Sequence, residues 1–210
     1  MDGAPVAYGP SEFARDTLAD SAAMVALQWF EAEVERANVS MNLIGPGTVG
    51  QFWSRHALDS AQLLRFAPAA LSWADLGAGA GFPGVVLAVL LKGRKGARVH
   101  LIDSVAKRCR FLAAVVEALD LPAEVHNARA EALALKVEVV TARACAPLER
   151  LLAYAQPYIA RGAEGLFLKG ESVADEVSAA KSKWRFDAQL SESISDPRGR
   201  VVRIRRLDRV

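Results

Sequence analysis

The 210-residue chain is nearly balanced in charge, with 26 Lys and Arg against 24 Asp and Glu, a formal net charge of +2 and 52% hydrophobic residues. This length and hydrophobicity suffice for one full core and predict one domain with room for an appendage. We find neither a leader-like segment nor an apolar run long enough to cross a bilayer, so we expect a cytoplasmic protein without a membrane partner. Cys109 and Cys145 form no C-x-x-C pair, so neither a metal site nor a disulfide is predicted.

The first 70 residues predict a helical segment packed on the rest of the chain. Residues 1–9 contain glycine and proline and predict a loose start. A helix is expected from about Ser11 to Asn38, where apolar residues recur at spacings of three and four. Glycines and a proline in 42–47 predict a turn, and a second helix is expected over 49–66.

One stripe of the second helix mixes apolar and polar side chains. It consists of Phe52, His56, Asp59, Leu63 and Phe66. His56 and Asp59 therefore lie on the face that ought to be buried, where polar groups need hydrogen-bond partners. Two interpretations remain open: these residues dock the helix on the following domain, or they take a direct part in catalysis.

From Leu71 onward, strands alternate with helices, which predicts a mostly parallel sheet covered on both faces. The predicted strands begin at Leu71 and at residues 97, 123, 138 and 165, and the predicted helices are 83–91, 105–119, a helix from Pro147, and 172–181. Residues 185–190 and 200–207 predict a final antiparallel pair. We therefore place an N-terminal helical segment at 1–70 and the main domain at 71–210.

A glycine-rich turn follows the first strand of this domain. Its sequence is Asp75-Leu76-Gly77-Ala78-Gly79-Ala80-Gly81-Phe82-Pro83-Gly84. Glycines at every second position let the backbone approach a ligand closely, and Pro83 suits the first helical position because its missing N–H has no partner there. The turn is therefore the predicted ligand site.

Two classes of ligand use a strand, a glycine turn and a helix. A dinucleotide places its pyrophosphate at the helix N-terminus, where the carboxylate of Asp75 would repel it. The same carboxylate suits a ligand with an ammonium group, such as S-adenosylmethionine (SAM). Gly79-x-Gly81-x-x-Gly84 also fits the dinucleotide pattern, so a dinucleotide and a purely structural turn remain alternatives to SAM.

The predicted strand ends gather further candidates, because ligands of open parallel sheets bind outside the carboxyl ends of the strands. These candidates are Asp75 and Gly77 from the first strand, Asp103 from the second, Ala130 and Glu131 after the third, and Arg143 from the fourth. The two oxygens of Asp103 are placed to accept both hydroxyls of a ribose. Phe82 and the pair Ser104 and Val105 are predicted to flank the adenine.

Basic residues are clustered in two places. Six arginines fall within the last thirteen residues against one acid, Asp208, and Lys92, Arg94, Lys95 and Arg98 lie in one loop. Such clusters can follow a phosphate backbone. Solvated surface explains them slightly better, so charge permits an RNA partner without establishing one.

Several motifs extend beyond the glycine turn. Arg55-His56-Ala57-Leu58-Asp59-Ser60 precedes it, and Asp103-Ser104-x-x-Lys107-Arg108-x-x-Phe111-Leu112 follows. Arg129-Ala130-Glu131, Arg143-Ala144-x-Ala146-Pro147-Leu148 and Leu168-Lys169-Gly170 continue the series. Over roughly residues 38–207 this order and spacing resemble the bacterial small-subunit ribosomal RNA methyltransferase G family, also called the glucose-inhibited division protein B family.

The resemblance implies a class I SAM-dependent methyltransferase, a Rossmann-like α/β fold with a mostly parallel seven-stranded sheet. It implies methylation of N7 of one guanine in 16S ribosomal RNA, with 16S RNA or the small ribosomal subunit as partner, not DNA; we expect a monomer. The predicted SAM contacts are Gly77, Gly79, Phe82, Asp103, Ser104, Val105, Ala130, Glu131 and Arg143. No side chain is predicted to be catalytic, because guanine N7 carries a lone pair and no proton. Another RNA or small substrate, a dinucleotide oxidoreductase and a non-catalytic SAM-binding module remain the alternatives.

Overall fold

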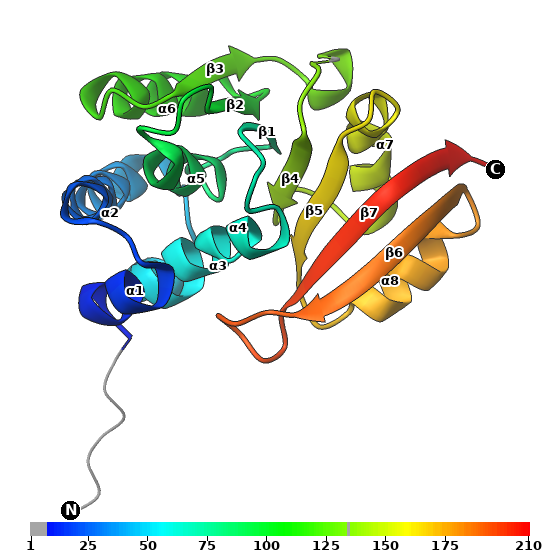
Figure 1. Cartoon of the computed structure of the whole chain (residues 1–210), viewed down its shortest axis with the longest axis horizontal. Coiled ribbons are helices and arrows are strands. Elements are labelled where there is room, and N and C mark those ends of the chain that lie inside the picture. Colours follow the sequence, from blue (N-terminus) through cyan, green and yellow to red (C-terminus); the bar gives the residue numbers. More distant parts are fainter. Residues whose placement is uncertain (1–7, 134) are drawn as a thin grey trace, which may run out of the picture.

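The computed structural model describes residues 8–133 and 135–210, which form one seven-stranded sheet between two layers of helices (Figure 1). The strands are β1 (Ser72–Leu76), β2 (Arg98–Asp103), β3 (Ala123–Asn127), β4 (Val139–Arg143), β5 (Glu164–Lys169), β6 (Trp184–Glu192) and β7 (Arg200–Arg209). Their order is β3-β2-β1-β4-β5-β7-β6. The first five strands run parallel, and β7 pairs antiparallel with both β5 and β6. The predicted mostly parallel sheet with a final antiparallel pair is confirmed.

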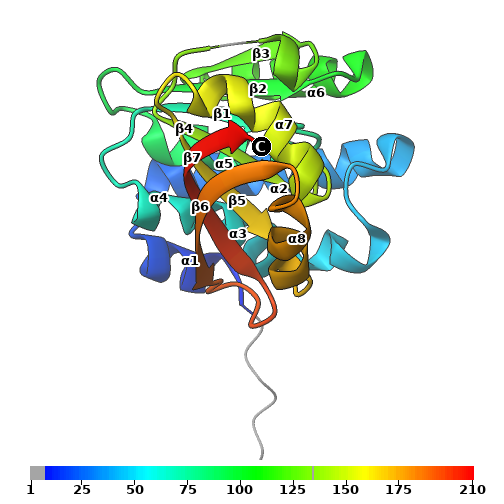
Figure 2. The same cartoon turned by 90° about the vertical axis from the view of Figure 1, so that its right-hand side faces the viewer.

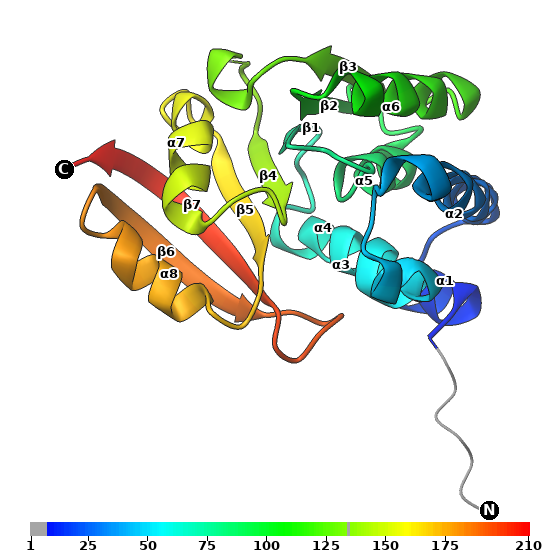
Figure 3. The same cartoon turned by 180° about the vertical axis from the view of Figure 1, so that it is seen from behind.

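The sheet is covered on both faces, and each face has its own hydrophobic core. The helices are α1 (Pro10–Thr17), α2 (Ser21–Met41), α3 (Asp59–Ala61), α4 (Leu63–Phe66), α5 (Gly84–Leu91), α6 (Ala106–Ala118), α7 (Leu148–Ile159) and α8 (Val173–Ala180). One core joins α1 to α6 with one face of the strands, and the other joins α7 and α8 with the opposite face. Figure 3 shows α7 and α8 in front of the sheet, and Figure 2 shows the β6–β7 hairpin turned toward the viewer.

Central strands with two covered faces need apolar residues at successive positions, not alternating ones. In β1, Trp73, Ala74 and Leu76 are all buried, and they are divided between the two cores. Helix α5 is likewise apolar throughout, as its sequence predicted, because it is enclosed between β1, β2 and α2.

The predicted helix from Ser11 to Asn38 is wrong in one respect, because it is two helices. Leu18 adopts a left-handed conformation, with φ of 57°, and ends α1. Asp20 then caps α2 by accepting a hydrogen bond from the backbone N–H of Ala23 at 2.8 Å. Asp16, Thr17 and Asp20 interrupt the apolar spacing between Phe13 and Ala23, a signal of the break that the prediction overlooked. The predicted loose start at 1–9 falls mostly outside the described residues.

The predicted continuous helix over 49–66 is also wrong. A 3₁₀ turn over Pro46–Gln51 leads into a π-helical turn over Phe52–Leu58, followed by the short helices α3 and α4. The wider π turn directs Phe52, Trp53, His56, Ala57 and Leu58 inward. A period of 3.6 residues per turn cannot anticipate this widening, which in other proteins often marks a functional site.

The helical segment and the sheet share one core. The ring of Phe13 in α1 lies 5.3 Å from that of Trp53, and Phe30 in α2 lies 5.3 Å from Phe82 in the glycine turn. Both pairs belong to the cluster that includes α5 and β2. The boundary at residue 70 stays a prediction, but side chains from both sides of it hold the glycine turn in place.

Gly84, the first residue of α5, is fixed by close packing against the sheet. A Cβ there would lie 2.2 Å from Leu101 Cδ2 and 2.7 Å from Asp75 Oδ2. We expect Gly84→Ala to lower the free energy of unfolding by about 1–3 kcal/mol, the usual cost of overpacking, despite the better helix propensity of Ala. Urea denaturation measures the change. Gly50→Ala, where a Cβ meets nothing within 4 Å, is the matched control, and equal stability of the two variants would contradict the packing argument.

Candidate functional site

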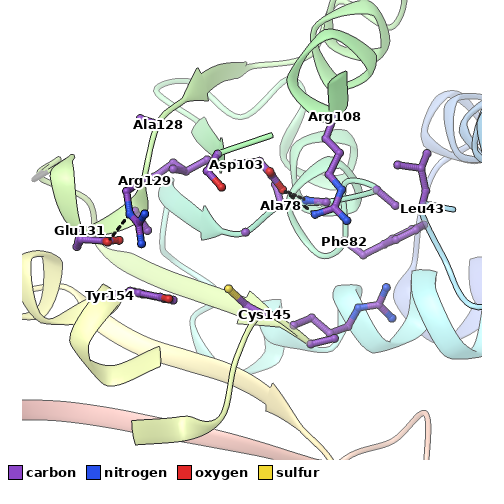
Figure 4. A pocket seen from close by; sticks show the side chains of 18 of the residues that line it. Leu43, Ala78, Phe82, Asp103, Arg108, Ala128, Arg129, Glu131, Cys145 and Tyr154 are labelled. Atoms are coloured by element: carbon purple, nitrogen blue, oxygen red, sulfur yellow. Dashed lines mark hydrogen bonds and ion pairs between the residues drawn. The ribbon is translucent and has the colours of Figure 1, made fainter. Parts of the chain in front are cut away.

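A cavity of about 400 Å³ opens at the carboxyl edge of the sheet, where the strand order reverses between β1 and β4. Figure 4 shows Asp103 between Arg129 and Glu131 on one side and Leu43 and Phe82 on the other. The predicted SAM contacts Gly77, Gly79, Phe82, Asp103, Ser104, Ala130, Glu131 and Arg143 all line this cavity. Val105 does not. Its side chain is exposed at the N-terminus of α6, so its predicted contact has less support than the others.

Asp103 connects the glycine turn to the start of α6. Its Oδ2 accepts a hydrogen bond from the backbone N–H of Gly79 at 3.0 Å, and its Oδ1 accepts one from that of Val105 at 2.8 Å. The guanidinium of Arg108 lies 3.7 Å away. A carboxylate oxygen has two acceptor positions, so each oxygen retains one for a ligand hydroxyl. The residue therefore shapes the cavity and can bind a ribose within it.

Gly77 packs closely against the loop that follows the neighbouring strand β4. Its φ is +70°, and a Cβ would lie 2.6 Å from Cys145 Sγ, in the loop after β4. Its backbone N–H donates to the carbonyl of Ile102 at 2.8 Å, which joins the turn to β2. The sequence alone explained this glycine by the close approach of a ligand to the backbone. The structure adds a second reason, because the thiol of Cys145 leaves no space for a side chain at this position.

The interpretation that the Asp75 carboxylate faces the ligand ammonium is wrong. Asp75 is fully buried and does not line the cavity. Its Oδ2 accepts a hydrogen bond from the backbone N–H of Gly84 at 2.8 Å, while its Oδ1 has no partner among the described residues. The Asp75 carboxylate therefore caps the N-terminus of α5 from its buried side.

Pro83 also differs from expectation. It occupies the N-cap position of α5, not the first helical position, and follows a cis Phe82–Pro83 bond.

Burial of the Asp75 carboxyl raises its pKa from 3.8 to about 7, against the hydrogen bond from Gly84. A raised folded-state pKa means that this group's stabilisation is fully present below pH 4 and is lost as the pH rises toward 7. We expect the free energy of unfolding to fall by on the order of 4 kcal/mol over this range because of Asp75 alone. Urea titrations from pH 4 to 8 should show a flatter profile for Asp75→Asn than for the wild type. Identical slopes would contradict this assignment.

Phe82, His56 and Arg143 form one stacked group, of which Phe82 and Arg143 line the cavity. The His56 ring stacks on Phe82 with centroids 4.8 Å apart, and the Arg143 guanidinium lies 4.9 Å from the Phe82 centroid. Arg143 Nη1 donates hydrogen bonds to His56 Nδ1 and to the carbonyl of Arg55, both at 2.8 Å. The Phe82 side chain is only 3% exposed, so it supports the cavity and offers no open face to an adenine ring.

His56 is neutral at physiological pH. Burial is the main reason that its pKa falls to about 3, and the charge of Arg143 adds to the shift against an opposing contribution from the backbone of Thr48. Because Nδ1 accepts from Arg143, the proton of the neutral ring lies on Nε2. His56 therefore positions Arg143 and Phe82 and is unsuited to act as a general base.

A second cavity, of about 450 Å³, adjoins the first. Leu43, Ile44, Arg143 and Ala144 line both cavities, while His56 and Asp59 line the second. The segment containing Leu43 and Ile44 was predicted only as a turn. The available signal was the pair of adjacent apolar residues, since apolar side chains in a predicted turn indicate that the turn packs against another part of the protein.

The outer rim of the first cavity contains charged residues beyond the predicted Glu131. Arg129 pairs with Glu131 at 2.9 Å, and Tyr154 of α7 also lines the cavity. The pKa of Glu131 lies below its usual range, mainly because its carboxylate accepts a backbone hydrogen bond and also because Arg129 is near. The rim therefore presents a carboxylate that stays ionised at neutral pH.

The basic loop, and Arg203 and Arg205 of the C-terminal cluster, lie away from the cavities. Arg203 and Arg205 both pair with Glu164, at the amino end of β5, which is the end of the sheet opposite the cavities. The loop holding Lys92 and Arg94 lies between α5 and β2, at the amino end of β2. The Lys169 ammonium does lie beside the second cavity, but it is 2.7 Å from the Glu176 carboxylate.

One group of possible metal ligands lies outside both cavities. His100, Glu124 and His126, on the adjacent strands β2 and β3, place one ligand atom each within 4.8 Å of one another. His100 Nδ1 and His126 Nε2 are 2.9 Å apart, the distance of a hydrogen bond between the two rings. That hydrogen bond accounts for the group, so the expectation of no metal stays a prediction.

Solved structures with the same fold define the class. A SAM-dependent methyltransferase from Aquifex aeolicus superposes with a TM-score of 0.55 over 83% of this chain and 97% of that chain, at 14% identity. Magnesium protoporphyrin IX methyltransferase from Synechocystis, solved with bound SAM, gives a TM-score of 0.54 over 90% and 99% at 13% identity. The fold is that of the class I SAM-dependent methyltransferases, as predicted.

Sequence comparison defines the family. The family profile described as rRNA small subunit methyltransferase G matches residues 23–200. Ribosomal RNA small subunit methyltransferase G of Caulobacter vibrioides is 60% identical over 86% of this chain and 84% of its own, and that of Caulobacter sp. strain K31 is 57% identical over 96% and 91%. The chain belongs to the rRNA small subunit methyltransferase G family. This membership decides against the dinucleotide oxidoreductase.

None of the helices in residues 8–133 and 135–210 is long and apolar enough to span a membrane.

Proposed function

We propose that this protein transfers the methyl group of SAM to N7 of one guanine in 16S ribosomal RNA, acting as a cytoplasmic monomer on the RNA or the small ribosomal subunit. The observation that carries the proposal is the pair of adjoining cavities, with Leu43, Ile44, Arg143 and Ala144 between them. One has a carboxylate placed for a ribose, and the other is large enough for a nucleoside. The names of the relatives supply the ribosomal RNA.

The residues of the first cavity fit SAM. The oxygens of Asp103 are available to ribose hydroxyls, Gly77 and Gly79 of the glycine turn line the cavity, and Glu131 supplies a negative charge at the rim. SAM, when bound, supplies a methyl group on a sulfonium that is already activated for transfer. The protein's part is to bind and orient the two reactants.

This reaction needs no proton acceptor on the enzyme. Guanine N7 attacks through a lone pair that carries no proton, so the neutral, hydrogen-bonded His56 is consistent with the chemistry. Holding the reacting atoms roughly 3 to 3.5 Å apart should account for most of the rate enhancement. The methylated ring is cationic, and the nearby Arg143 charge is offset by the carboxylate of Asp59 at 3.8 Å.

The target guanine should be unpaired or displaced from its helix. In A-form RNA the N7 edge faces a deep, narrow groove that side chains cannot enter. A nucleotide turned out of its stack can instead enter the second cavity beside the SAM site.

Transfer of label tests this function. Tritiated SAM is incubated with the protein and with 16S RNA from cells lacking the endogenous methyltransferase, and 23S RNA serves as the control. We expect label in 16S RNA and none in 23S RNA. SAM binding without transfer to either RNA or to small ribosomal subunits would indicate a non-catalytic SAM-binding module.

A further inference from the structure

The second cavity contains a carboxylate with one oxygen anchored and one oxygen available. Asp59 Oδ1 accepts hydrogen bonds from Ser195 Oγ at 2.7 Å and from Gln62 Nε2 at 2.8 Å. Oδ2 accepts none from the described residues, and its closest cation is Arg143 Nη1, at 3.8 Å, too far for a hydrogen bond. The side chain is 17% exposed and lines the cavity. Oδ2 is therefore accessible to an occupant.

The frame around Asp59 is rigid. Gln62 also donates to Ser193 Oγ at 3.0 Å and accepts from the backbone N–H of Ile194 at 3.1 Å. Arg55 forms an ion pair with Asp196 in the same turn between β6 and β7. The helical segment and this turn thus hold the carboxylate from two sides. A preorganised acceptor loses little conformational entropy when it binds a ligand.

The charges around the cavity favour a ligand that donates hydrogen bonds. Lys169, which lines the cavity, is paired with Glu176 at 2.7 Å, and Arg143 is held by His56. A phosphate at Asp59 would meet a second anion, whereas an N–H group would meet an acceptor with unused lone pairs. Leu43, Ile44 and Leu168 supply apolar wall, as expected for the face of a base.

Guanine alone among the four RNA bases presents two adjacent N–H donors, N1–H and N2–H₂, on its Watson–Crick edge. The corresponding edges of adenine and cytosine place a ring acceptor beside one amine, and uracil flanks its N–H with two carbonyls. A carboxylate therefore attracts the guanine edge and repels part of each of the others.

We propose that Asp59 is the residue that selects guanine, with Oδ2 accepting hydrogen bonds from N1–H and N2–H₂ of the target base in the second cavity. The inference rests on the proposed function and adds the basis of its base specificity. N7 lies on the opposite side of the purine from N2. A guanine anchored at Asp59 therefore turns its N7 edge away from the carboxylate, so the edge that accepts the methyl group stays free of this contact.

Substrates with and without the N2 amine test the contact. The wild type and Asp59→Asn are assayed on 16S RNA carrying either guanosine or inosine at the mapped target position, since inosine lacks only the N2 amine. In the Asp59→Asn variant the side-chain oxygen can still accept from Ser195 and Gln62, while the amide that replaces Oδ2 opposes the guanine donors. We expect Asp59→Asn to lower kcat/KM on the guanosine RNA by roughly 10- to 100-fold, the range of a good base-edge contact.

The coupling between the two changes is the decisive readout. Inosine should slow the wild type by a similar factor but should have little further effect on Asp59→Asn, and SAM affinity should be unchanged in the variant. Ser195→Ala removes one anchor and keeps the carboxylate, so it should retain discrimination against inosine. Equal losses for Asp59→Asn on both RNAs, or no loss on either, would overturn the role of Asp59. Transfer by the wild type to neither RNA would instead overturn the proposed function, and this inference with it.

Discussion

Gly77→Val is expected to abolish measurable SAM binding while the protein remains folded. Valine at this position must adopt a φ of +70°, which branched side chains strongly disfavour, and its Cβ would lie 2.6 Å from Cys145 Sγ. Relief of that contact moves the turn away from β4 or into the cavity. Either movement displaces the backbone around Gly79 that the Asp103 carboxylate holds. Calorimetric titration with SAM measures the loss.

Gly93→Val is the matched control for this variant. Gly93 has a φ of +85° and a Cβ there meets nothing within 4 Å, so the substitution carries similar backbone strain in open space away from the cavity. We expect the two variants to lose comparable thermal stability but only Gly77→Val to lose SAM binding. Wild-type affinity in folded Gly77→Val would refute the location of the site.

Asp103→Ala is expected to have the second-largest effect. The substitution removes the acceptor for two backbone N–H groups, of Gly79 and Val105, together with the proposed ribose contact. Loss of hydrogen bonds to a charged acceptor costs about 1.5–3 kcal/mol, so SAM affinity should fall by roughly 10- to 150-fold. Asp187→Ala, at an exposed position in β6, serves as the control and should bind SAM normally. Unchanged affinity of a folded Asp103→Ala would remove this residue from the site.

The sheet was predictable because its central strands and helices differ strongly in composition and are separated by clear turn signals. β3 and β7 begin at the predicted residues, and each of the other strands begins within one residue of the predicted start. The N-terminal segment was predicted less well, since the polar residues that interrupt the apolar spacing near Leu18 were overlooked. The π-helical turn over Phe52–Leu58 changes the period itself, which a search at 3.6 residues per turn cannot detect.

The strand-end residues of the site were predictable from topology, because parallel strands bring their carboxyl ends to one edge. Asp75 was misread because the sequence shows that it lies near the glycine turn but not that its side chain points beneath α5. Leu43, Ile44 and Tyr154 reach the cavity from distant parts of the chain, so spacing carried no signal for them. These residues reach the cavity only because α2 and α7 pack on the sheet.

The arginine-rich C-terminus shows a limit of reading charge from composition. Arg203 and Arg205 alternate with the apolar residues of β7 as expected, but Glu164 on the adjacent β5 neutralises them. The sequence separation between these partners hides the pairing. Arg200, the first residue of β7, lies opposite Lys169 at the cavity end of the sheet, and we propose it in place of Arg203 and Arg205 as a candidate for RNA contact.

Identification of the methylated nucleoside tests the central claim most directly. 16S RNA labelled by this protein from tritiated SAM is digested to nucleosides, which are separated and identified by mass, and the labelled position is mapped in the intact RNA. We predict that the label elutes as 7-methylguanosine and maps to one position. Label in any other methylated nucleoside, or spread over many guanines, would contradict the proposed function.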